Sequence, residues 1–179
     1  MPRITKKELE KIFKTSASAD ELFDYFRIAV DNKLKDAYLY KILLWNRALS
    51  PDEILMYAEK ICKVHPGLSY QIYYWVGQVF SSISVYGEHH DKAFEYFQKA
   101  SKVSPSEIEP YLAITKLYNF DLNIPEFEKI IRFMKKGIES TELKSKVCFA
   151  LSKLCKKKGD RETEKTYQKL GEKYQREGK

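Results

Sequence analysis

The sequence predicts an all-α protein built from antiparallel helix hairpins, and three observations carry this prediction. Helix-start signals recur along the chain, apolar residues follow them at spacings of three and four, and anchor residues, mostly tyrosines, return about every 35 residues. No stretch shows sustained alternation of apolar and polar residues with hairpin dipeptides. Only seven Gly and six Pro occur in 179 residues, which argues against a loop-rich protein.

Five segments have the form of a capping box or a close variant, in which a side-chain oxygen accepts a first-turn amide hydrogen and an acidic residue reaches back. They are Thr5-x-x-Glu8, Ser18-x-x-Glu21, Ser50-x-x-Glu53, Ser104-x-x-Glu107 and Asn123-x-x-Glu126. Pro51 and Pro105 follow their caps directly, at the first helical position, and Pro125 lies one place later. The predicted helices cover residues 4–14, 19–33, 36–48, 51–64, 68–84, 90–102, 106–119, 124–138, 142–157 and 160–176.

The apolar residues inside these segments repeat with the period of a helix, and the connections between the segments are short. Short connections imply antiparallel neighbours packed as hairpins. Repetition also appears on a longer scale, because the anchors Tyr38, Tyr73, Tyr111 and Val147 lie 35, 38 and 36 residues apart. A period of this length is typical of stacked helix pairs, each of which needs a neighbour to bury its apolar face.

The middle of the chain carries the most specific pattern, Tyr73-x-x-Val76-Gly77-x-x-Phe80, then Ala93-x-x-x-Phe97-x-x-Ala100, then Pro105. This resembles the tetratricopeptide repeat (TPR), whose pattern is W-x-x-L-G-x-x-Y, then A-x-x-x-F, then A and P. Tyr73 and Val76 stand where the family has Trp and Leu. The turn from Ser81 to Asp91 is about four residues longer than the usual repeat allows. Looser matches extend over roughly residues 36–176.

The resemblance implies a right-handed α-solenoid, a TPR-like superhelix. Residues 36–179 would form the repeat array, with the polar last helix as its cap, and residues 1–35 would form a helical pair capping the other end. Small residues such as Gly77, Ala93 and Ala100 would let helices approach closely, and Phe80 and Phe97 would fill the space between hairpins.

TPR arrays bind peptides along a concave groove lined by the first helix of each pair, which implies a set of contact residues here. These are Leu39, Leu43, Asn46, Tyr74, Gln78, Ser81, Leu112, Lys116, Asn119 and Ser152. For Leu39, Leu43 and Leu112, packing against neighbouring helices is an equal alternative. Polar residues in a groove are more diagnostic, which favours Asn46 and Gln78, together with Asn119. The lysines and asparagines with which some TPR proteins grip a terminal carboxylate are not reproduced.

The last quarter of the chain is strongly basic. Residues 1–128 hold 16 Lys+Arg and 18 Asp+Glu, whereas residues 129–179 hold 16 and 7. The basic residues cluster at Lys153, Lys156, Lys157, Lys158 and Arg161. Such a patch suits nucleic acid or an acidic protein surface. Interleaved glutamates and few aromatics weigh against nucleic acid, and lysines at a helix C-terminus also have a structural explanation.

Motifs for catalysis, cofactors or membrane insertion are not found in the sequence. It has no Gly-rich phosphate loop, HExxH motif or nucleophile elbow. His89 and His90, with Glu88 and Asp91, form a loose metal candidate that reads more simply as a polar turn. The cysteines are three in number and lack CxxC spacing, which indicates reduced thiols. With no signal peptide or apolar span, we expect a cytoplasmic protein.

These features together predict a protein-interaction module without enzymatic activity, cofactor or metal. It would present a preformed groove to an extended or helical segment of a partner protein. The alternative is a nucleic-acid-associated adaptor that uses the basic C-terminal quarter. Any nucleic-acid binding by that patch is expected to be weak, independent of sequence and lost at moderate salt. The partner, the pathway and the oligomeric state are not encoded in any motif.

Overall fold

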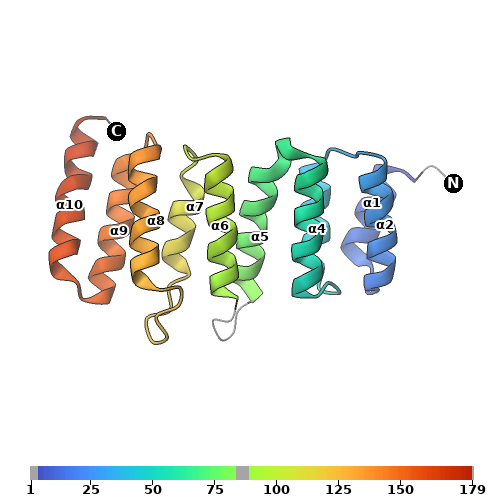
Figure 1. Ribbon diagram of the computed structural model, residues 1–179, viewed down its shortest axis with the longest axis horizontal. Helices are drawn as coiled ribbons and strands as arrows, with labels where there is room; N and C mark the ends of the chain where they lie inside the picture. Colours follow the sequence, from blue (N-terminus) through green and yellow to red (C-terminus); the bar gives the residue numbers. More distant parts are fainter. Residues whose placement is uncertain (1–3, 84–88, 179) are drawn as a thin grey trace. The chain divides into compact units, whose positions relative to one another are not determined.

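The computed structural model describes residues 4–83 and 89–178, which fold into ten α-helices and two short 3-10 helices (Figure 1). These ranges contain no strand, only an isolated antiparallel backbone bridge between Asn119 and Ile124. The chain is an all-α solenoid of antiparallel helix hairpins, as the sequence predicts. It divides into two compact units, Met1–Val79 and Phe80–Lys179, and α5 runs across the boundary. The predicted division at residue 35 falls inside the first unit and stays a prediction.

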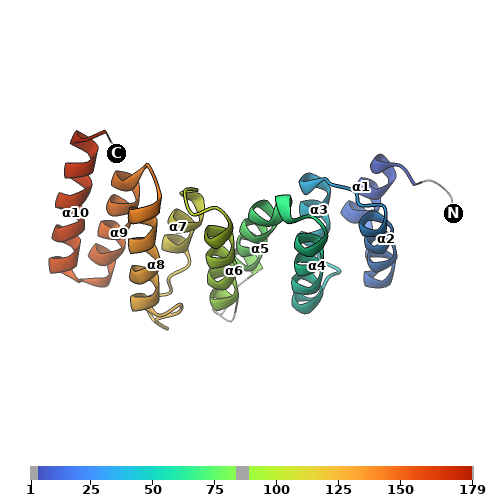
Figure 2. The same ribbon diagram turned by 45° about the horizontal axis from the view of Figure 1, so that its top comes forward.

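The first unit contains four helices and the start of a fifth, arranged in two layers. The elements are α1 (Lys6–Thr15), α2 (Ala19–Asp31), α3 (Ala37–Leu44), α4 (Pro51–Val64), η1 (Pro66–Leu68) and α5 (Ser69–Ile83). In both ribbon views α1, α3 and α5 lie in one layer, and α2 and α4 lie in the other (Figures 1 and 2). The largest fully buried side chains of this unit are Phe13, Leu22, Leu39, Tyr40, Leu43, Leu44, Tyr57, Ile61 and Ile72. They form the apolar core of this unit.

The second unit repeats this arrangement. Its elements after α5 are α6 (His90–Val103), α7 (Glu109–Ala113), η2 (Ile114–Lys116), α8 (Phe127–Ser140), α9 (Lys144–Lys158) and α10 (Arg161–Arg176). Figures 1 and 2 place α7 and α9 in one layer and α6 and α8 in the other. Phe80, Phe97 and Ile114 are fully buried. The polar α10 packs along α9, as expected of the last helix in an array.

Two of the five predicted capping boxes form completely. The Thr5 hydroxyl accepts from the Glu8 backbone N–H at 3.3 Å, and the Glu8 carboxylate accepts from the Thr5 N–H at 2.7 Å. Ser50 and Glu53 repeat the same pair of bonds before α4. Ser18 caps α2 through the Glu21 N–H at 3.2 Å. The Glu21 carboxylate accepts instead from the Ser16 hydroxyl at 2.5 Å.

The other two predicted boxes, at Ser104 and Asn123, do not begin helices. The helices that follow them, α7 and α8, therefore begin later than predicted. Ser104 is the C-cap of α6, and its N–H donates to the Ala100 carbonyl. The next helix begins only at Glu109, because Pro110 lacks an N–H and is tolerated only in a first turn. Ser104 and Pro105 therefore lie before α7 and do not begin it.

Asn123 also fails to cap a helix. It has a left-handed φ of 52°, and its side-chain oxygen accepts from the Tyr118 hydroxyl at 2.8 Å. The Asn119 N–H donates to the Ile124 carbonyl at 2.9 Å, which closes a loop where the sequence predicts continuous helix to residue 119. Helix α8 then begins after this loop, at Phe127, so Pro125 precedes it.

The remaining chemical expectations concern thiols, metals and membranes. Cys62, Cys148 and Cys155 are buried, and burial raises the pKa of Cys148 and of Cys155 to about 11. Among residues 4–83 and 89–178, no group of His, Cys, Asp and Glu is arranged to hold a metal, and Glu88 lies outside the described residues. Within the same ranges, none of the helices is both long and apolar enough to cross a membrane.

Candidate functional site: an aromatic hollow in the first unit

A hollow of 420 Å³ opens on the layer that α1, α3 and α5 form in the first unit. We call it the aromatic hollow; it is lined by Phe13, Lys14, Tyr38, Lys41, Ile42, Trp45, Asn46 and Trp75. Two of these residues come from α1, five from α3 and the turn after it, and one from α5. None of the lining residues belongs to α2 or α4. The first helices of three successive pairs, α1, α3 and α5, therefore build one site.

Asn46 fixes the end of the hollow where α1 and α3 terminate. Its amide nitrogen donates to the Phe13 carbonyl at 2.8 Å and to the Ser16 carbonyl at 3.0 Å. Its amide oxygen accepts from the Ala48 N–H at 2.8 Å, which shapes the turn after α3. The last carbonyls of a helix have no partner inside that helix. Asn46 supplies partners for the end of α1 and ties α3 to it.

Trp75 fixes the opposite wall. Its indole N–H donates to the Lys41 carbonyl at 2.9 Å, so α5 is hydrogen-bonded to the backbone of α3. The Trp75 ring also contacts the Trp45 ring, with centroids 5.8 Å apart and planes at 50°. The Lys41 ammonium lies 5.8 Å from the Trp75 centroid, within the range of a cation–π contact. The hollow is therefore held in shape before any ligand arrives.

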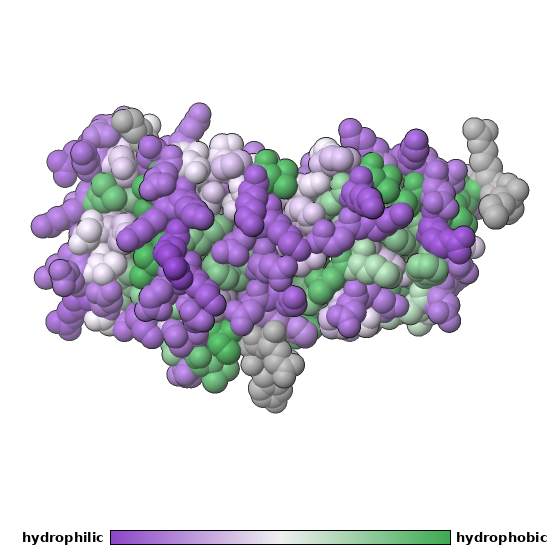
Figure 3. All heavy atoms as spheres, in the orientation of Figure 1, coloured by the Kyte–Doolittle hydropathy of each residue, from purple (hydrophilic) through white to green (hydrophobic). Residues whose placement is uncertain are grey.

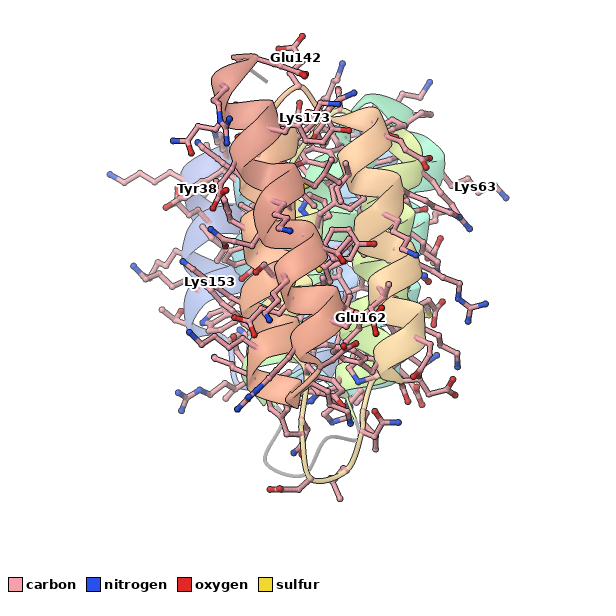
Figure 4. The ribbon with its side chains drawn as sticks, turned by 90° about the vertical axis from the view of Figure 1, so that its left-hand side faces the viewer. Tyr38, Lys63, Glu142, Lys153, Glu162 and Lys173 are labelled. Atoms are coloured by element: carbon pink, nitrogen blue, oxygen red, sulfur yellow. The ribbon has the colours of Figure 1, made fainter. Side chains whose placement is uncertain are left out.

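The apolar rings of the hollow remain open to solvent. Tyr38 is 60% exposed and Trp45 is 51% exposed. Tyr38 points to the side of the first unit opposite to Lys63 of α4 (Figure 4). Exposed large aromatic side chains gathered at one hollow are typical of binding surfaces.

The structure corrects the predicted groove residues of α3. Leu39 and Leu43 have no exposed surface, so they belong to the core and cannot contact a ligand. Asn46 lines the hollow, but its amide is taken up by the three bonds described above. The open face of α3 instead carries Tyr38, one of the anchors of the repeat pattern, and, seven residues on, Trp45.

Tyr38, Ile42 and Trp45, which line the hollow, each lie one position before a predicted groove residue of α3. Tyr38 and Ile42 lie 36 residues before Tyr74 and Gln78, the groove residues predicted on α5. A spacing of 35 aligns Leu39 and Leu43 with them instead, and one residue turns a helix face by 100°. Tyr74 and Gln78 are half-buried on α5, and the Tyr70 and Tyr74 rings stack 6.1 Å apart. Their part in ligand contact stays a prediction.

The predicted groove residues of the second unit take different roles. Ser81 is half-buried near the end of α5, Leu112 is half-buried, and Lys116 is exposed; for these three, ligand contact stays a prediction. The Asn119 side chain accepts from two loop amides at 3.0 Å and so shapes the loop after η2. Ser152 is only 3% exposed and donates to a carbonyl of α10, which makes it a packing residue and corrects the groove assignment.

The basic cluster lies at the end of α9 and the start of α10. Lys153, Lys156, Lys157, Lys158 and Arg161 are all exposed, and Figure 4 shows Lys153 pointing outward. Lys158 has a structural role, since its ammonium donates to the Tyr118 hydroxyl at 2.8 Å. It also lies 5.7 Å from the centroid of the Phe127 ring. Lysines in the last turn of α9 also offset the negative end of the helix dipole.

A second hollow, of 690 Å³, lies between α6 and α8 in the second unit. Its walls carry charges of both signs: Asp91, Glu95 and Glu126, with Lys129, Arg132 and Lys136. Several of these are already paired, as in the Lys129–Glu126 contact of 2.9 Å. Figure 3 shows this face as mostly hydrophilic, with hydrophobic surface at the loop before α8, where Leu122 is 52% exposed. The aromatic hollow is the better candidate because most of its lining residues are aromatic or apolar and its charged side chains are all of one sign.

Comparison with known proteins supports the fold. No family model matches the sequence, and no curated protein sequence matches it. Among solved structures the chain is similar to MamA, a TPR-like protein, with a TM-score of 0.53 and 15% sequence identity. The likeness covers 98% of this chain and 97% of that chain. At this identity the comparison shows a shared helical-repeat fold.

Proposed function

We propose that the chain is a protein-interaction module that binds a segment of a partner protein at the aromatic hollow. The observation that carries the proposal is the exposure of Tyr38 and Trp45 on a hollow built by three successive first helices. Interface hot spots are enriched in Trp and Tyr because one such ring buries a large area with little loss of conformational freedom.

The shape of the hollow supports a protein segment as its ligand. A volume of 420 Å³ falls within the usual range of binding clefts and accommodates one or two bulky side chains. The bonds from Asn46 and Trp75 preform the site, which lowers the ordering cost of binding.

The proposal is tested by comparing two double variants in affinity capture. Tyr38→Ala with Trp45→Ala removes the rings of the hollow, whereas Phe23→Ala with Met56→Ala removes exposed apolar side chains from α2 and α4. Tagged wild-type and variant proteins are used to capture partners from cells that express the protein, and the bound proteins are quantified by mass spectrometry. Circular dichroism checks that both variants fold.

We expect a defined set of proteins to be lost with the first variant and retained with the second. The loss follows because truncating a hot-spot aromatic costs about 2 kcal/mol or more of binding free energy, which is over tenfold in affinity. Equal capture by the folded first variant and the wild type would contradict the proposal.

A further inference from the structure

The charge of the aromatic hollow points to the chemistry of its ligand. The only charged side chains among its lining residues are Lys14 and Lys41. Building on the proposed function, we propose that the hollow recognises an acidic segment that carries one bulky apolar side chain. The apolar side chain lies on the Trp45 and Trp75 rings, and flanking carboxylates bind the ammonium groups of the two lysines.

Both lysines are available for a ligand. Within residues 4–83 and 89–178, neither Lys14 nor Lys41 makes an ion pair with a carboxylate of the chain. Lys41 is held over the Trp75 ring, but an ammonium group has three N–H donors and a ring face satisfies none of them fully. A carboxylate arriving beside that ring finds a positioned cation, and charge-assisted hydrogen bonds are the stronger kind.

The acidic residue that caps α3, Asp36, does not cancel this charge. Asp36 lies just before α3 and pairs with Lys6 of α1. Burial works to raise the pKa of the Asp36 carboxyl, but the hydrogen bond from Lys6, the backbone hydrogen bond from Leu39 and the charge of Lys6 together hold this pKa below its usual value. Asp36 and Lys6 are therefore a neutralised pair, and the net charge of the hollow comes from Lys14 and Lys41.

The apolar part of the hollow calls for a side chain without a hydrogen-bonding tip. Ile42 and the two indole rings are apolar lining residues that are not fully buried, and the Trp75 indole N–H is already donated to the Lys41 carbonyl. Aromatic rings also attract cations, so a basic ligand is the competing chemistry. Lys41 already occupies the Trp75 ring, and two positive charges would repel a second cation.

The two tryptophans make the site directly observable. The chain contains only two Trp residues, and both Trp45 and Trp75 line the hollow. Intrinsic tryptophan fluorescence of the purified protein therefore reports binding at this site. The probes are three end-blocked peptides of equal length without Trp or Tyr: a Glu-rich peptide with a central Phe, the same peptide with a central Ala, and a Lys-rich peptide with the central Phe.

We expect a saturable fluorescence change with the Glu-rich Phe peptide. The Glu-rich Ala peptide should bind about tenfold more weakly or worse, because burial of a Phe side chain is lost. The Lys-rich Phe peptide should give no saturable change. Raising the salt concentration should weaken binding of the Glu-rich Phe peptide, since exposed ion pairs are screened. Equal or tighter binding of the Lys-rich peptide would overturn the inference, and so would the absence of binding by all three.

A charge reversal gives a second, independent arm. Lys14→Glu with Lys41→Glu should weaken the Glu-rich Phe peptide by about tenfold or more and allow the Lys-rich Phe peptide to bind. Lys60→Glu with Lys63→Glu, on α4, changes the net charge by the same amount and should leave both affinities within about twofold of the wild type. If the first variant fails to fold, the comparison of peptides on the wild type still decides the matter.

The outcomes separate this inference from the proposed function. Loss of partner capture with Tyr38→Ala and Trp45→Ala, together with peptide binding that ignores charge, would keep the interaction module and remove the acidic ligand. Unchanged capture with that variant would remove the proposed site itself, whatever the peptides do.

Discussion

Replacing Asn46 by Ala should loosen the first unit at the point where α1 meets α3. The change removes three hydrogen bonds, with donor–acceptor distances of 2.8, 3.0 and 2.8 Å. A hydrogen bond contributes about 0.5–1.5 kcal/mol net to stability, so complete loss of the three would cost at most about 4.5 kcal/mol. Asn46 is half-buried, and water replaces part of what is lost. We therefore expect the free energy of unfolding to fall by about 2 kcal/mol.

Urea unfolding followed by tryptophan fluorescence reports on the first unit, because both Trp45 and Trp75 lie in it. Asn46→Asp is the informative companion variant. It keeps the acceptor for the Ala48 N–H but turns a carboxylate toward the Phe13 and Ser16 carbonyls. These oxygens favour the protonated carboxyl and raise its pKa in the folded state. The stability of the Asn46→Asp protein relative to wild type should therefore recover as the pH falls through that raised pKa.

If Asn46→Ala lowers the free energy of unfolding by less than about 0.5 kcal/mol, the range of ordinary surface substitutions, the three hydrogen bonds of Asn46 do not stabilise the first unit as described. If the stability lost in Asn46→Asp does not recover at lower pH, the bonds that the Asn46 amide nitrogen donates are not what stabilises this site. Either result would show that Asn46 does not hold this end of the aromatic hollow in shape.

Three further substitutions test the packing of the second unit by thermal denaturation. Gly137→Ala would place a Cβ 2.6 Å from Cγ of the buried Tyr111, so overpacking of about 1–3 kcal/mol should outweigh the gain of about 1 kcal/mol in helix propensity; a raised Tm would contradict this. Gly159 ends α9 with a φ of 84°, and Gly159→Ala should cost about 1 kcal/mol of backbone strain although its Cβ would meet no atom. Phe97→Ala should cost about 3–5 kcal/mol through the cavity it leaves, and a loss under about 1 kcal/mol would show that Phe97 is not a core residue.

Local signals in the sequence were sufficient for most of the fold. The boxes at Thr5 and Ser50 form as predicted because every partner lies within three residues of the cap. The same motif failed at Ser104, where Pro110 delays the helix, and that proline is itself visible in the sequence. At Asn123 the loop is set by contacts with residues that precede it, and no cap motif contains that information.

The binding face was harder to predict because it depends on register. The period of α3 allows two apolar faces one residue apart, and Tyr38 and Trp45 look like core residues by type. Their exposure depends on which neighbouring helix covers Leu39 and Leu43, which sequence spacing does not show. Asn46 is a polar residue within the repeat pattern, as a groove residue would be, yet its amide is committed to backbone bonds thirty residues away.

Photo-crosslinking in living cells shows whether a partner protein docks at the aromatic hollow. A photoreactive phenylalanine analogue is placed at Tyr38, beside the aromatic hollow, or at Lys63, which points to the opposite side of the same unit (Figure 4). Light should join the protein to a discrete partner from position 38 and not from position 63. Addition of excess Glu-rich Phe peptide to a lysate before illumination should suppress the product. A product formed equally from both positions, or only from position 63, would contradict the account.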